Sequence, residues 1–291
     1  MTILILGAGG LIGHHLTPAL AKAGHAVVAR PHAELDITDP IGAVETLEEV
    51  NPALVINAAG LVNFAACEAD PEASRRINLE APLRWAGLCA DRGIPFWAFS
   101  SDYVFDGLAR TPYAEEATPH PRSVYARDKA ALEARMTEYS DHLTLRVSWV
   151  YGSGGKTFMS LLPGLLATRE ELTVASGKRG SCLYAADAAD LLCRLLPHRP
   201  TGILNLVNTG EASWESFAIR CLDRMQILGM PVTCRRIRQV SYRTLASDGS
   251  GERPEYSVLS TARIEGFGWP VPGWESAQDR FLAEARHPQA G

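Results

Sequence analysis

Residues 3–13 read Ile-Leu-Ile-Leu-Gly-Ala-Gly-Gly-Leu-Ile-Gly, and this stretch decides the fold of the 291-residue chain. The apolar run 3–6 predicts a strand, and the apolar spacing over residues 11–23 predicts a helix directly after it. Glycines at such a junction allow a tight turn and let backbone N–H groups approach a pyrophosphate. The stretch therefore predicts a dinucleotide-binding turn, made of Gly7, Gly9, Gly10, Leu11, Ile12 and Gly13.

The same alternation of strand and helix continues along the chain. Strand-like runs at 26–29, 53–57, 95–99 and 142–147 are separated by helical patterns, including 72–91 and 123–139. This pattern is typical of an α/β protein with a parallel sheet, so we expect a Rossmann-type doubly wound sheet. We expect residues 1–151 with about 172–198 to form the nucleotide-binding domain. Residues about 152–171 and 199–291 then form a smaller, mainly C-terminal α/β substrate lobe.

The ends of the second and third predicted strands bear on the choice of dinucleotide. An arginine there favours the 2′-phosphate of NADP, whereas NAD enzymes carry an acid. Arg30 therefore favours NADP, with NAD as the alternative. An arginine that is only solvated at the surface would, however, look the same in the sequence. Asp36 and Ile37 are candidates to lie near the adenine, unless this segment only caps the next helix, for which Asp39 is better placed. Small residues close the third strand where a ribose must approach the backbone: Asn57, Ala58, Ala59 and Gly60.

A candidate catalytic pair lies in Val-Tyr-Ala-Arg-Asp-Lys, residues 124–129. On a helix, Tyr125 and Lys129 lie on one face, a single turn apart. A free phenol titrates near ~10, and a nearby ammonium lowers the work of releasing its proton. Such pairs also arise by chance, but here the glycine turn and Ser100-Ser-Asp-Tyr103 lie upstream. Together these three features predict a hydride-transfer enzyme.

Composition and charge argue against several other functions. The formal net charge is −5 and the pI about 5.9, so a nucleic-acid-binding surface is not expected. Apolar runs stay below the ~18 residues of a membrane span, and the first residues lack the features of a signal peptide. The six cysteines lack Cys-x-x-Cys spacing, and His14 and His15 have no accompanying ligand cluster. We expect a cytoplasmic enzyme without a metal, acting on a small molecule.

Five stretches together resemble the extended short-chain dehydrogenase/reductase family. They are residues 7–13, Asn57-Ala-Ala, Ser100-Ser-Asp-Tyr-Val-Phe105, Tyr125-x-x-x-Lys129 and Arg146-Val-Ser-Trp-Val-Tyr-Gly152. Within it the chain is similar to the dTDP-4-dehydrorhamnose reductase branch, whose C-terminal signature resembles Arg253-Pro-Glu-Tyr-Ser-Val-Leu-Ser-Thr261. The resemblance implies NADPH-dependent reduction of a keto group on a nucleoside-diphosphate 4-keto-6-deoxysugar. Related enzymes are often dimers, so a homodimer is an expectation as well.

The resemblance also implies roles for individual residues. Tyr125 protonates the alkoxide that forms as hydride reaches the carbonyl carbon, and Lys129 binds the nicotinamide ribose and keeps the tyrosine acidic. Ser101 binds the carbonyl oxygen, as a hydrogen-bond donor at a developing negative charge should. Asp102 and Tyr103 flank the substrate, and Trp149 projects into the cleft unless it is a core residue. Ser100 and Asn78 are placed at the cofactor, although Asn78 could equally lie on a helix surface.

Two loops depart from the pattern of that branch and leave the substrate open. The chain reads Asn63-Phe-Ala-Ala-Cys-Glu68, which keeps Glu68 but has Ala65 where the branch has an aspartate. It also reads Gly177-Lys-Arg-Gly-Ser-Cys-Leu183 in place of a Gln-x-Gly-x-Pro-Thr-like loop. Lys178 and Arg179 could bind a phosphate or carboxylate of the substrate, or form a solvated turn. Two alternatives therefore remain, a tailoring reductase of a non-sugar carbonyl or imine, and a non-catalytic NADP-binding subunit like the methionine adenosyltransferase β-subunit.

Overall fold

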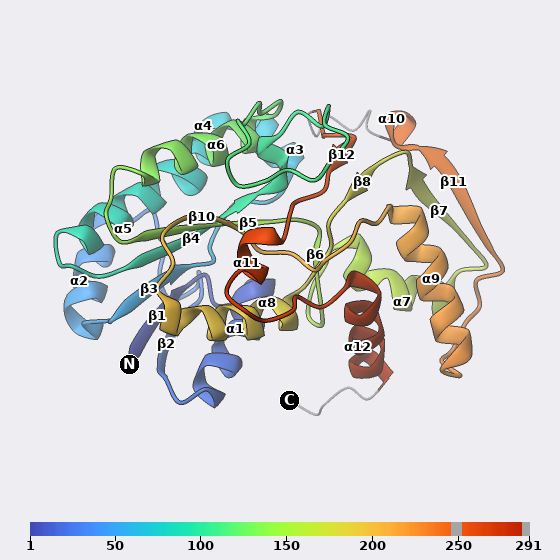
Figure 1. The fold of residues 1–291 in the computed structure, drawn as a ribbon, viewed down its shortest axis with the longest axis horizontal. Coiled ribbons are helices and arrows are strands. Elements are labelled where there is room, and N and C mark those ends of the chain that lie inside the picture. Colours follow the sequence, from blue (N-terminus) through green and yellow to red (C-terminus); the bar gives the residue numbers. More distant parts are fainter. Residues whose placement is uncertain (246–251, 287–291) are drawn as a thin grey trace.

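The computed structural model describes residues 1–245 and 252–286, and its central feature is a parallel sheet of six strands (Figure 1). These strands are β1 (Thr2–Leu6), β2 (Ala26–Arg30), β3 (Leu54–Asn57), β4 (Phe96–Ser101), β5 (His142–Val147) and β10 (Gly202–Asn205). Their order across the sheet is β10-β5-β4-β3-β1-β2. The predicted α/β class with a parallel sheet is confirmed.

The strand order changes direction at β1. The chain runs from β1 outward to β2, and then crosses back so that β3 pairs with the other side of β1. Ligands of open parallel sheets bind beyond the carboxyl ends of the strands at such a switch point. Here those ends are Leu6, which leads into the glycine turn, and Asn57. The topology thus places the predicted dinucleotide-binding residues of two strands side by side.

Helices cover both faces of the central sheet. One face carries α1 (Leu11–Lys22), α8 (Ala185–Leu195) and α11 (Ala262–Glu265), and the other carries α2 (Pro40–Val50), α5 (Ala81–Ala90) and α6 (Val124–Met136). Side chains of β1 alternate between the two cores, with Ile3 and Ile5 on the first face and Leu4 and Leu6 on the second. Because both faces are covered, the strand must be apolar throughout, which explains its uninterrupted run of aliphatic residues.

The long helix expected at 72–91 is divided into three parts. It begins as α4 (Pro71–Arg75), continues as the π-helical turn η1 (Arg76–Glu80), and ends as α5. Pro82 has no N–H with which to bond the carbonyl four residues earlier, that of Asn78, so the regular α-helical hydrogen-bond pattern is interrupted here. Asn78 lies within this turn and is fully buried, so the alternative of an exposed helix position is wrong.

The remaining elements build a second lobe around a separate apolar core. Its helices are α7 (Phe158–Thr168), α9 (Trp214–Ile227), α10 (Tyr242–Leu245) and α12 (Trp274–Arg286). Its strands are β6 (Val150–Tyr151), β7 (Glu171–Ser176), β8 (Arg179–Gly180), β9 (Leu183–Tyr184), β11 (Arg236–Ser241) and β12 (Tyr256–Ser257). They pair as β7 with β11, β8 with β12, and β6 with β9. The chain also forms three short helical segments: α3 (Phe64–Ala69), η2 (Asp102–Val104) and η3 (Leu196–His198).

Two strands, β7 and β10, do not lie in the part of the molecule that their positions in the sequence suggested. Residues from about 172 are expected in the nucleotide-binding domain, but β7 pairs with β11 and buries Leu172 and Val174 in the core of the second lobe. Residues from 199 onward are expected in the substrate lobe, but β10 pairs with β5 at the edge of the central sheet. A short apolar run predicts a strand without naming its partner. The division into two domains at the boundaries given above stays a prediction.

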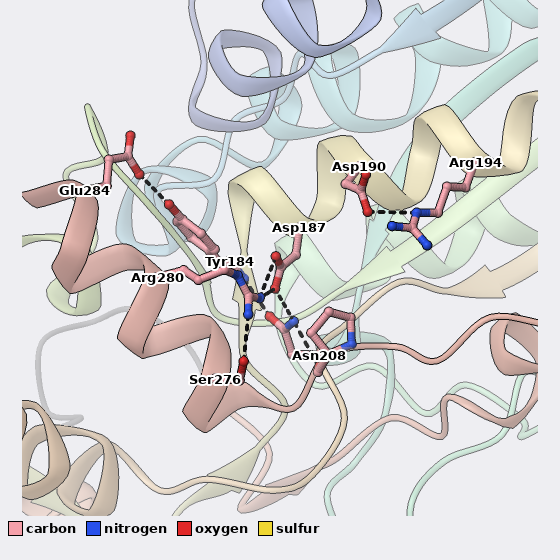
Figure 2. Close-up of polar contacts among 9 residues, drawn as sticks. Tyr184, Asp187, Asp190, Arg194, Asn208, Ser276, Arg280 and Glu284 are labelled. Atoms are coloured by element: carbon pink, nitrogen blue, oxygen red, sulfur yellow. Dashed lines mark hydrogen bonds and ion pairs between the residues drawn. The ribbon is translucent and has the colours of Figure 1, made fainter. Parts of the chain in front are cut away.

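A polar network fastens the last helix to the body of the protein (Figure 2). Arg280 of α12 reaches Asp187 at the start of α8 and also donates to Ser276 at 2.7 Å. Asn208 donates to the same aspartate at 2.6 Å and accepts from the backbone N–H of Tyr184 at 2.8 Å. The network therefore joins α12, α8 and the segment after β10 at one point.

Among the residues described, no helix is long and apolar enough to cross a membrane.

Candidate active site

A cavity of about 430 Å³ opens at the carboxyl edge of the central sheet, beside the switch point. Its walls come from the glycine turn, the ends of β3, β4 and β5, helix α6, and the start of α7 and α9 in the second lobe. The predicted residues that line it are Gly10, Leu11, Ile12, Ala58, Ala59, Gly60, Ser100, Ser101, Asp102, Tyr103, Tyr125, Lys129 and Trp149. Residues far apart in the sequence therefore meet in one space between the two lobes.

The glycine turn has the geometry that a pyrophosphate cradle requires. Gly7 has a φ of +72°, and a Cβ there would lie 2.5 Å from the backbone nitrogen of Ala59. A Cβ on Gly13 would lie 2.6 Å from the Cα of Ala8, so the helix can pack this closely against the turn only with glycine. Gly10 precedes α1 without any side-chain cap, which leaves the first turn of the helix open to an anion. These residues fit a bound dinucleotide.

The residues expected near the adenosine end lie outside the walls of this cavity. Arg30 ends β2, and its guanidinium lies 3.1 Å from Glu49 and 3.7 Å from Glu34. Asp36 accepts hydrogen bonds from the backbone N–H and hydroxyl of Thr38, both at 2.8 Å, and these bonds lower its pKa.

The neighbouring residues have structural contacts of their own. Ile37 is buried, and its carbonyl accepts from Trp85 at 3.1 Å. Asp39 caps α2 by accepting from the N–H of Ile41 at 3.0 Å, as the alternative interpretation expected for that residue. Binding of the adenosine by Arg30, Asp36 and Ile37 stays a prediction.

Two asparagines hold the loop after β3. Asn57 accepts from the N–H of Ala59 at 3.0 Å. Asn78 accepts from the N–H of Leu61 and donates to the carbonyl of Leu61, both at 3.0 Å. A Cβ on Gly60 would lie 3.2 Å from this asparagine's Oδ1 and 3.7 Å from Nζ of Lys129. Asn78 thus lies behind the cavity wall and fixes the loop that faces the lysine.

Helix α6 carries the Tyr–Lys pair into the cavity. Ser123 caps the helix through the N–H of Ala126 at 3.3 Å, and Glu68 accepts from the N–H of Val124 at 2.7 Å. The retained glutamate of the altered loop therefore anchors the helix beside Tyr125. Tyr125 is 6% exposed and Lys129 is 4% exposed.

The two side chains meet without a direct hydrogen bond. Nζ of Lys129 lies 5.9 Å from the centre of the Tyr125 ring and donates to the carbonyl of Phe99 at 3.0 Å. Burial raises the pKa of the Tyr125 phenol, and the Ser101 hydroxyl opposes this shift. Burial lowers the pKa of Lys129 to about 8, partly offset by the charge of Asp128. The phenol is therefore protonated near neutral pH, and a cation lies beside its ring.

Ser101 and Asp102 lie together where β4 ends. The Ser101 hydroxyl donates to Oδ1 of Asp102 at 3.1 Å and accepts from the N–H of Tyr103 at 3.2 Å. Asp102 is 2% exposed, and burial raises its pKa to about 6, against the lowering effect of the Ser257, Ser148 and Ser101 hydroxyls and of Lys178. Two polar side chains thus face the space next to the Tyr125 phenol.

The side chain of Ser100, the residue before Ser101, stabilises the packing of α6 against the sheet. Its hydroxyl donates to Glu133 of α6 at 2.6 Å, and Glu133 also binds Arg146 of β5 through two bonds of 2.9 and 2.8 Å. Both charged groups are fully enclosed. This network holds α6 against β4 and β5, and so fixes the position of Tyr125 relative to Ser101.

Aromatic side chains that the sequence did not single out complete the walls. Phe64 lies 4.9 Å from Tyr103 and 5.0 Å from Tyr125, measured between ring centres, and the Arg253 guanidinium lies 5.0 Å above its ring. Phe158 and Trp214 stack at 5.6 Å at the opposite side. The sequence gives little sign of them, since Phe64 lies in the altered loop and the other two are the first residues of α7 and α9.

Three further candidates for substrate binding, Trp149, Lys178 and Arg179, lie in different surroundings. Trp149 lines the cavity with a φ of 37°, and a Cβ on Gly180 would lie 2.8 Å from its ring. Arg179 extends to the surface and pairs with Glu211. Lys178 is 4% exposed and lies next to Tyr103. The structure therefore separates the two adjacent basic residues, one buried near the cavity and one at the surface.

Known proteins resemble this chain along its whole length. A dTDP-4-dehydrorhamnose reductase of Streptomyces griseus is 32% identical over 282 residues, covering 94% of this chain and 90% of that protein. A probable dTDP-4,6-dihydroxy-2-methyloxan-3-one 4-ketoreductase of Streptomyces antibioticus is 34% identical over 298 residues, covering 99% and 98%.

A solved structure has the same fold. The crystal structure of a dTDP-4-dehydrorhamnose reductase from Bacillus anthracis in complex with NADP superposes with a TM-score of 0.89 at 27% identity, covering 97% of this chain and 99% of that one. The resemblance to the extended short-chain dehydrogenase/reductases is thereby confirmed. With a family model that matches residues 1–287, the chain belongs to the RmlD substrate binding domain family.

Proposed function

We propose that this protein is an NADPH-dependent reductase of the keto group of a nucleoside-diphosphate 4-keto-6-deoxysugar. One observation carries the proposal: Ser101, Tyr125 and Lys129 face the same cavity as the glycine turn. A hydroxyl donor, a protonated phenol and a cation beside a dinucleotide site are the groups that carbonyl reduction needs. The names of the Streptomyces griseus and Streptomyces antibioticus relatives support a keto sugar as the substrate.

The side chains of this protein have distinct tasks in the proposed reaction. When bound, NADPH supplies the hydride. The Ser101 hydroxyl turns its proton from Oδ1 of Asp102 to the carbonyl oxygen of the substrate. Together with the Tyr125 phenol it binds and polarises that oxygen. Tyr125 transfers its proton to that oxygen as negative charge develops there. Lys129 stabilises the resulting tyrosinate through space, since its ammonium is held near the ring by the carbonyl of Phe99.

The surroundings of these groups support the same function. The aromatic walls formed by Phe64, Phe158 and Trp214 exclude water from the reacting groups, which strengthens every electrostatic contact inside. The cavity also joins the two lobes, so one lobe holds the dinucleotide turn while the other contributes walls next to the sugar. We further propose that the enzyme works in the cytoplasm, as its composition suggested, and that it forms a homodimer, as the resemblance implied.

The experiment is a spectrophotometric assay with purified protein, NADPH and dTDP-4-dehydrorhamnose, followed by identification of the product by NMR. Consumption of NADPH with formation of the 4-hydroxy sugar supports the proposal. Turnover of non-sugar ketones or imines alone would favour a tailoring reductase. Binding of NADPH without turnover of any carbonyl, together with co-purification of a large protein, would favour a regulatory subunit. Size-exclusion chromatography with light scattering tests the dimer.

A further inference from the structure

A buried chain of hydrogen bonds behind the active site joins helix α6 to the loop after β3. The Ser74 hydroxyl of α4 donates to Oδ2 of Asp128 on α6 at 2.6 Å, and both residues are buried. The side-chain amide of Asn78 donates to the same hydroxyl at 3.3 Å. Asn78 also holds the backbone N–H and carbonyl of Leu61, at 3.0 Å each. The chain therefore runs from α6 through α4 and the π-helical turn to the loop.

The bond between Ser74 and Asp128 has the features of a charge-assisted hydrogen bond. Its length lies in the range of a hydroxyl that donates to a carboxylate. Burial raises the pKa of Asp128, and the Ser74 hydroxyl opposes that rise. A buried carboxylate is costly unless donors compensate it. Loss of this hydroxyl would therefore leave the carboxylate of Asp128 without this donor and the amide of Asn78 without this acceptor.

The two ends of the chain lead to two neighbouring walls of the active-site cavity. Asp128 directly precedes Lys129 on α6, and Leu61 directly follows Gly60. Lys129 and Gly60 both line the cavity, and a Cβ on the glycine would lie 3.7 Å from Nζ of the lysine. The lysine is expected to bind the nicotinamide ribose, and the glycine ends the small residues expected where a ribose approaches the backbone. The chain thus links two walls of the expected ribose site.

A different network ties α6 to the central sheet. Glu133 accepts from Ser100 of β4 and binds Arg146 of β5, so these bonds fix the helix relative to the strands. The bond from Ser74 adds a second kind of constraint, because the same hydroxyl is bonded to Asn78. It sets the position of the helix relative to the loop after β3.

We propose that Ser74 and Asp128 are positioning residues for the nicotinamide ribose of the cofactor. Their hydrogen bond fixes Asn78, and thereby holds the loop that ends at Gly60 at a set distance from Lys129. Ser74 and Asp128 lie behind the residues that line the cavity, so they act through their neighbours and touch neither cofactor nor substrate. The inference deepens the proposed function, and its kinetic part rests on that function.

The first test measures NADPH binding, which needs no sugar. Ser74→Ala removes the shared hydroxyl and should raise the Kd for NADPH about three- to tenfold, the effect of losing one buried hydrogen bond. Ser181→Ala removes another fully buried hydroxyl, which accepts from the N–H of Leu259 at 3.0 Å in the second lobe. It should lower the stability of the fold and leave this Kd unchanged. A Kd that is unchanged in Ser74→Ala, or raised equally in both variants, would overturn the proposal.

Substitutions at Asp128 separate the hydrogen bond from the charge. Asp128→Asn keeps an amide that can bond to Ser74, so its Kd for NADPH should stay within about twofold of wild type. Asp128→Ala removes the acceptor and should raise the Kd as Ser74→Ala does. The double variant with alanine at both positions should be little worse than either single one, because the same bond is lost. Additive effects, or an Asp128→Asn that binds as weakly as Asp128→Ala, would contradict the positioning role.

Kinetics then show whether the displaced ribose affects the reaction. With dTDP-4-dehydrorhamnose and saturating NADPH, Ser74→Ala should lower kcat about tenfold, because a shifted nicotinamide lies farther from the carbonyl carbon. The KM for the sugar should stay near wild type. A raised KM with an unchanged kcat would overturn the proposal.

Two outcomes keep this inference separate from the proposed function. A wild type that turns over no keto sugar defeats the proposed function, whereas a raised Kd for NADPH in Ser74→Ala would still establish the positioning role. Turnover by the wild type with an unchanged Kd in Ser74→Ala has the opposite meaning. If Ser74→Ala does not fold by circular dichroism, Ser74→Cys replaces it, since it nearly keeps the size and weakens the donor, and it should raise the Kd in the same direction.

Discussion

The ammonium of Lys129 lies 5.9 Å from the centre of the Tyr125 ring and is bonded to the carbonyl of Phe99, not to the phenol. The lysine therefore affects the tyrosine through space, from a position fixed by β4. Because burial raises the pKa of Tyr125, the phenol keeps its proton until an acceptor arrives. The cation matters at the moment of transfer, when a negative charge would otherwise be left in an enclosed site.

The decrease of kcat at alkaline pH should reflect the deprotonation of Lys129. Burial lowers its pKa to about 8, so the ammonium is charged below that pH and becomes neutral as the pH rises through it. We expect kcat for keto-sugar reduction to fall over this pH range, because the neutral amine no longer stabilises the tyrosinate. Lys129→Arg keeps its charge at high pH and should be slower but without the alkaline fall. A wild-type kcat that stays constant well above pH 8 would contradict this role.

Arg30 should set the preference between the two nicotinamide cofactors. Arg30→Ala should raise the KM for NADPH about tenfold, the size of a lost charge-assisted contact, with little change for NADH. Glu49 pairs with the same guanidinium at 3.1 Å and competes with a phosphate. Glu49→Gln should therefore shift the preference toward NADPH, opposite to Arg30→Ala. Equal effects of Arg30→Ala on both cofactors would show that Arg30 does not contact the 2′-phosphate of NADPH.

The glycine turn offers a test of cofactor binding with a matched control. A Cβ at Gly13 would lie 2.6 Å from the Cα of Ala8, so Gly13→Ala should displace the turn and weaken NADPH binding by more than tenfold, roughly what a lost set of phosphate contacts costs. Gly164→Ala adds the same methyl group on α7, where nothing lies within 4 Å. Fluorescence titration with NADPH measures both. Equal affinity for the two variants would argue against the cradle.

The buried pair under α6 should carry much of the local stability. Glu133→Ala leaves Arg146 enclosed without its partner, which typically costs about 3–5 kcal/mol in the free energy of unfolding. Glu138→Ala removes an exposed partner of Arg135 and should cost about 1 kcal/mol or less. Urea unfolding compares the two. A loss of similar size in both variants would mean that the buried network contributes no more than a surface pair.

The sequence predicted the central sheet well because its strands are buried on both faces. Runs such as residues 3–6 and 54–56 are continuous and apolar, and each is followed by a glycine-containing turn. The partners of β7 and β10 could not be predicted, since pairing depends on long-range packing and not on the composition of a short strand. The π-helical turn at Asn78 likewise depends on Pro82 and on the contacts of Leu61.

Motifs identified candidate residues that line one cavity, and packing determines what each of them contacts. Tyr125, Lys129 and Ser101 come together as their spacing and the resemblance predicted. The sequence could not separate Lys178 from Arg179, because adjacent residues in a turn can point in opposite directions. The aromatic walls were missed for a similar reason: a phenylalanine or tryptophan at the start of a helix is more often part of the core.

The most direct test of the account is the turnover of Tyr125→Phe, which removes only the phenolic oxygen. With NADPH and dTDP-4-dehydrorhamnose, we expect kcat to fall about 10²–10⁴-fold, the contribution of a general acid, while the Kd for NADPH stays near wild type. Retained cofactor binding would show that the fold and the glycine turn are intact. A variant that reduces the keto sugar at the wild-type rate would contradict the role of Tyr125 as proton donor.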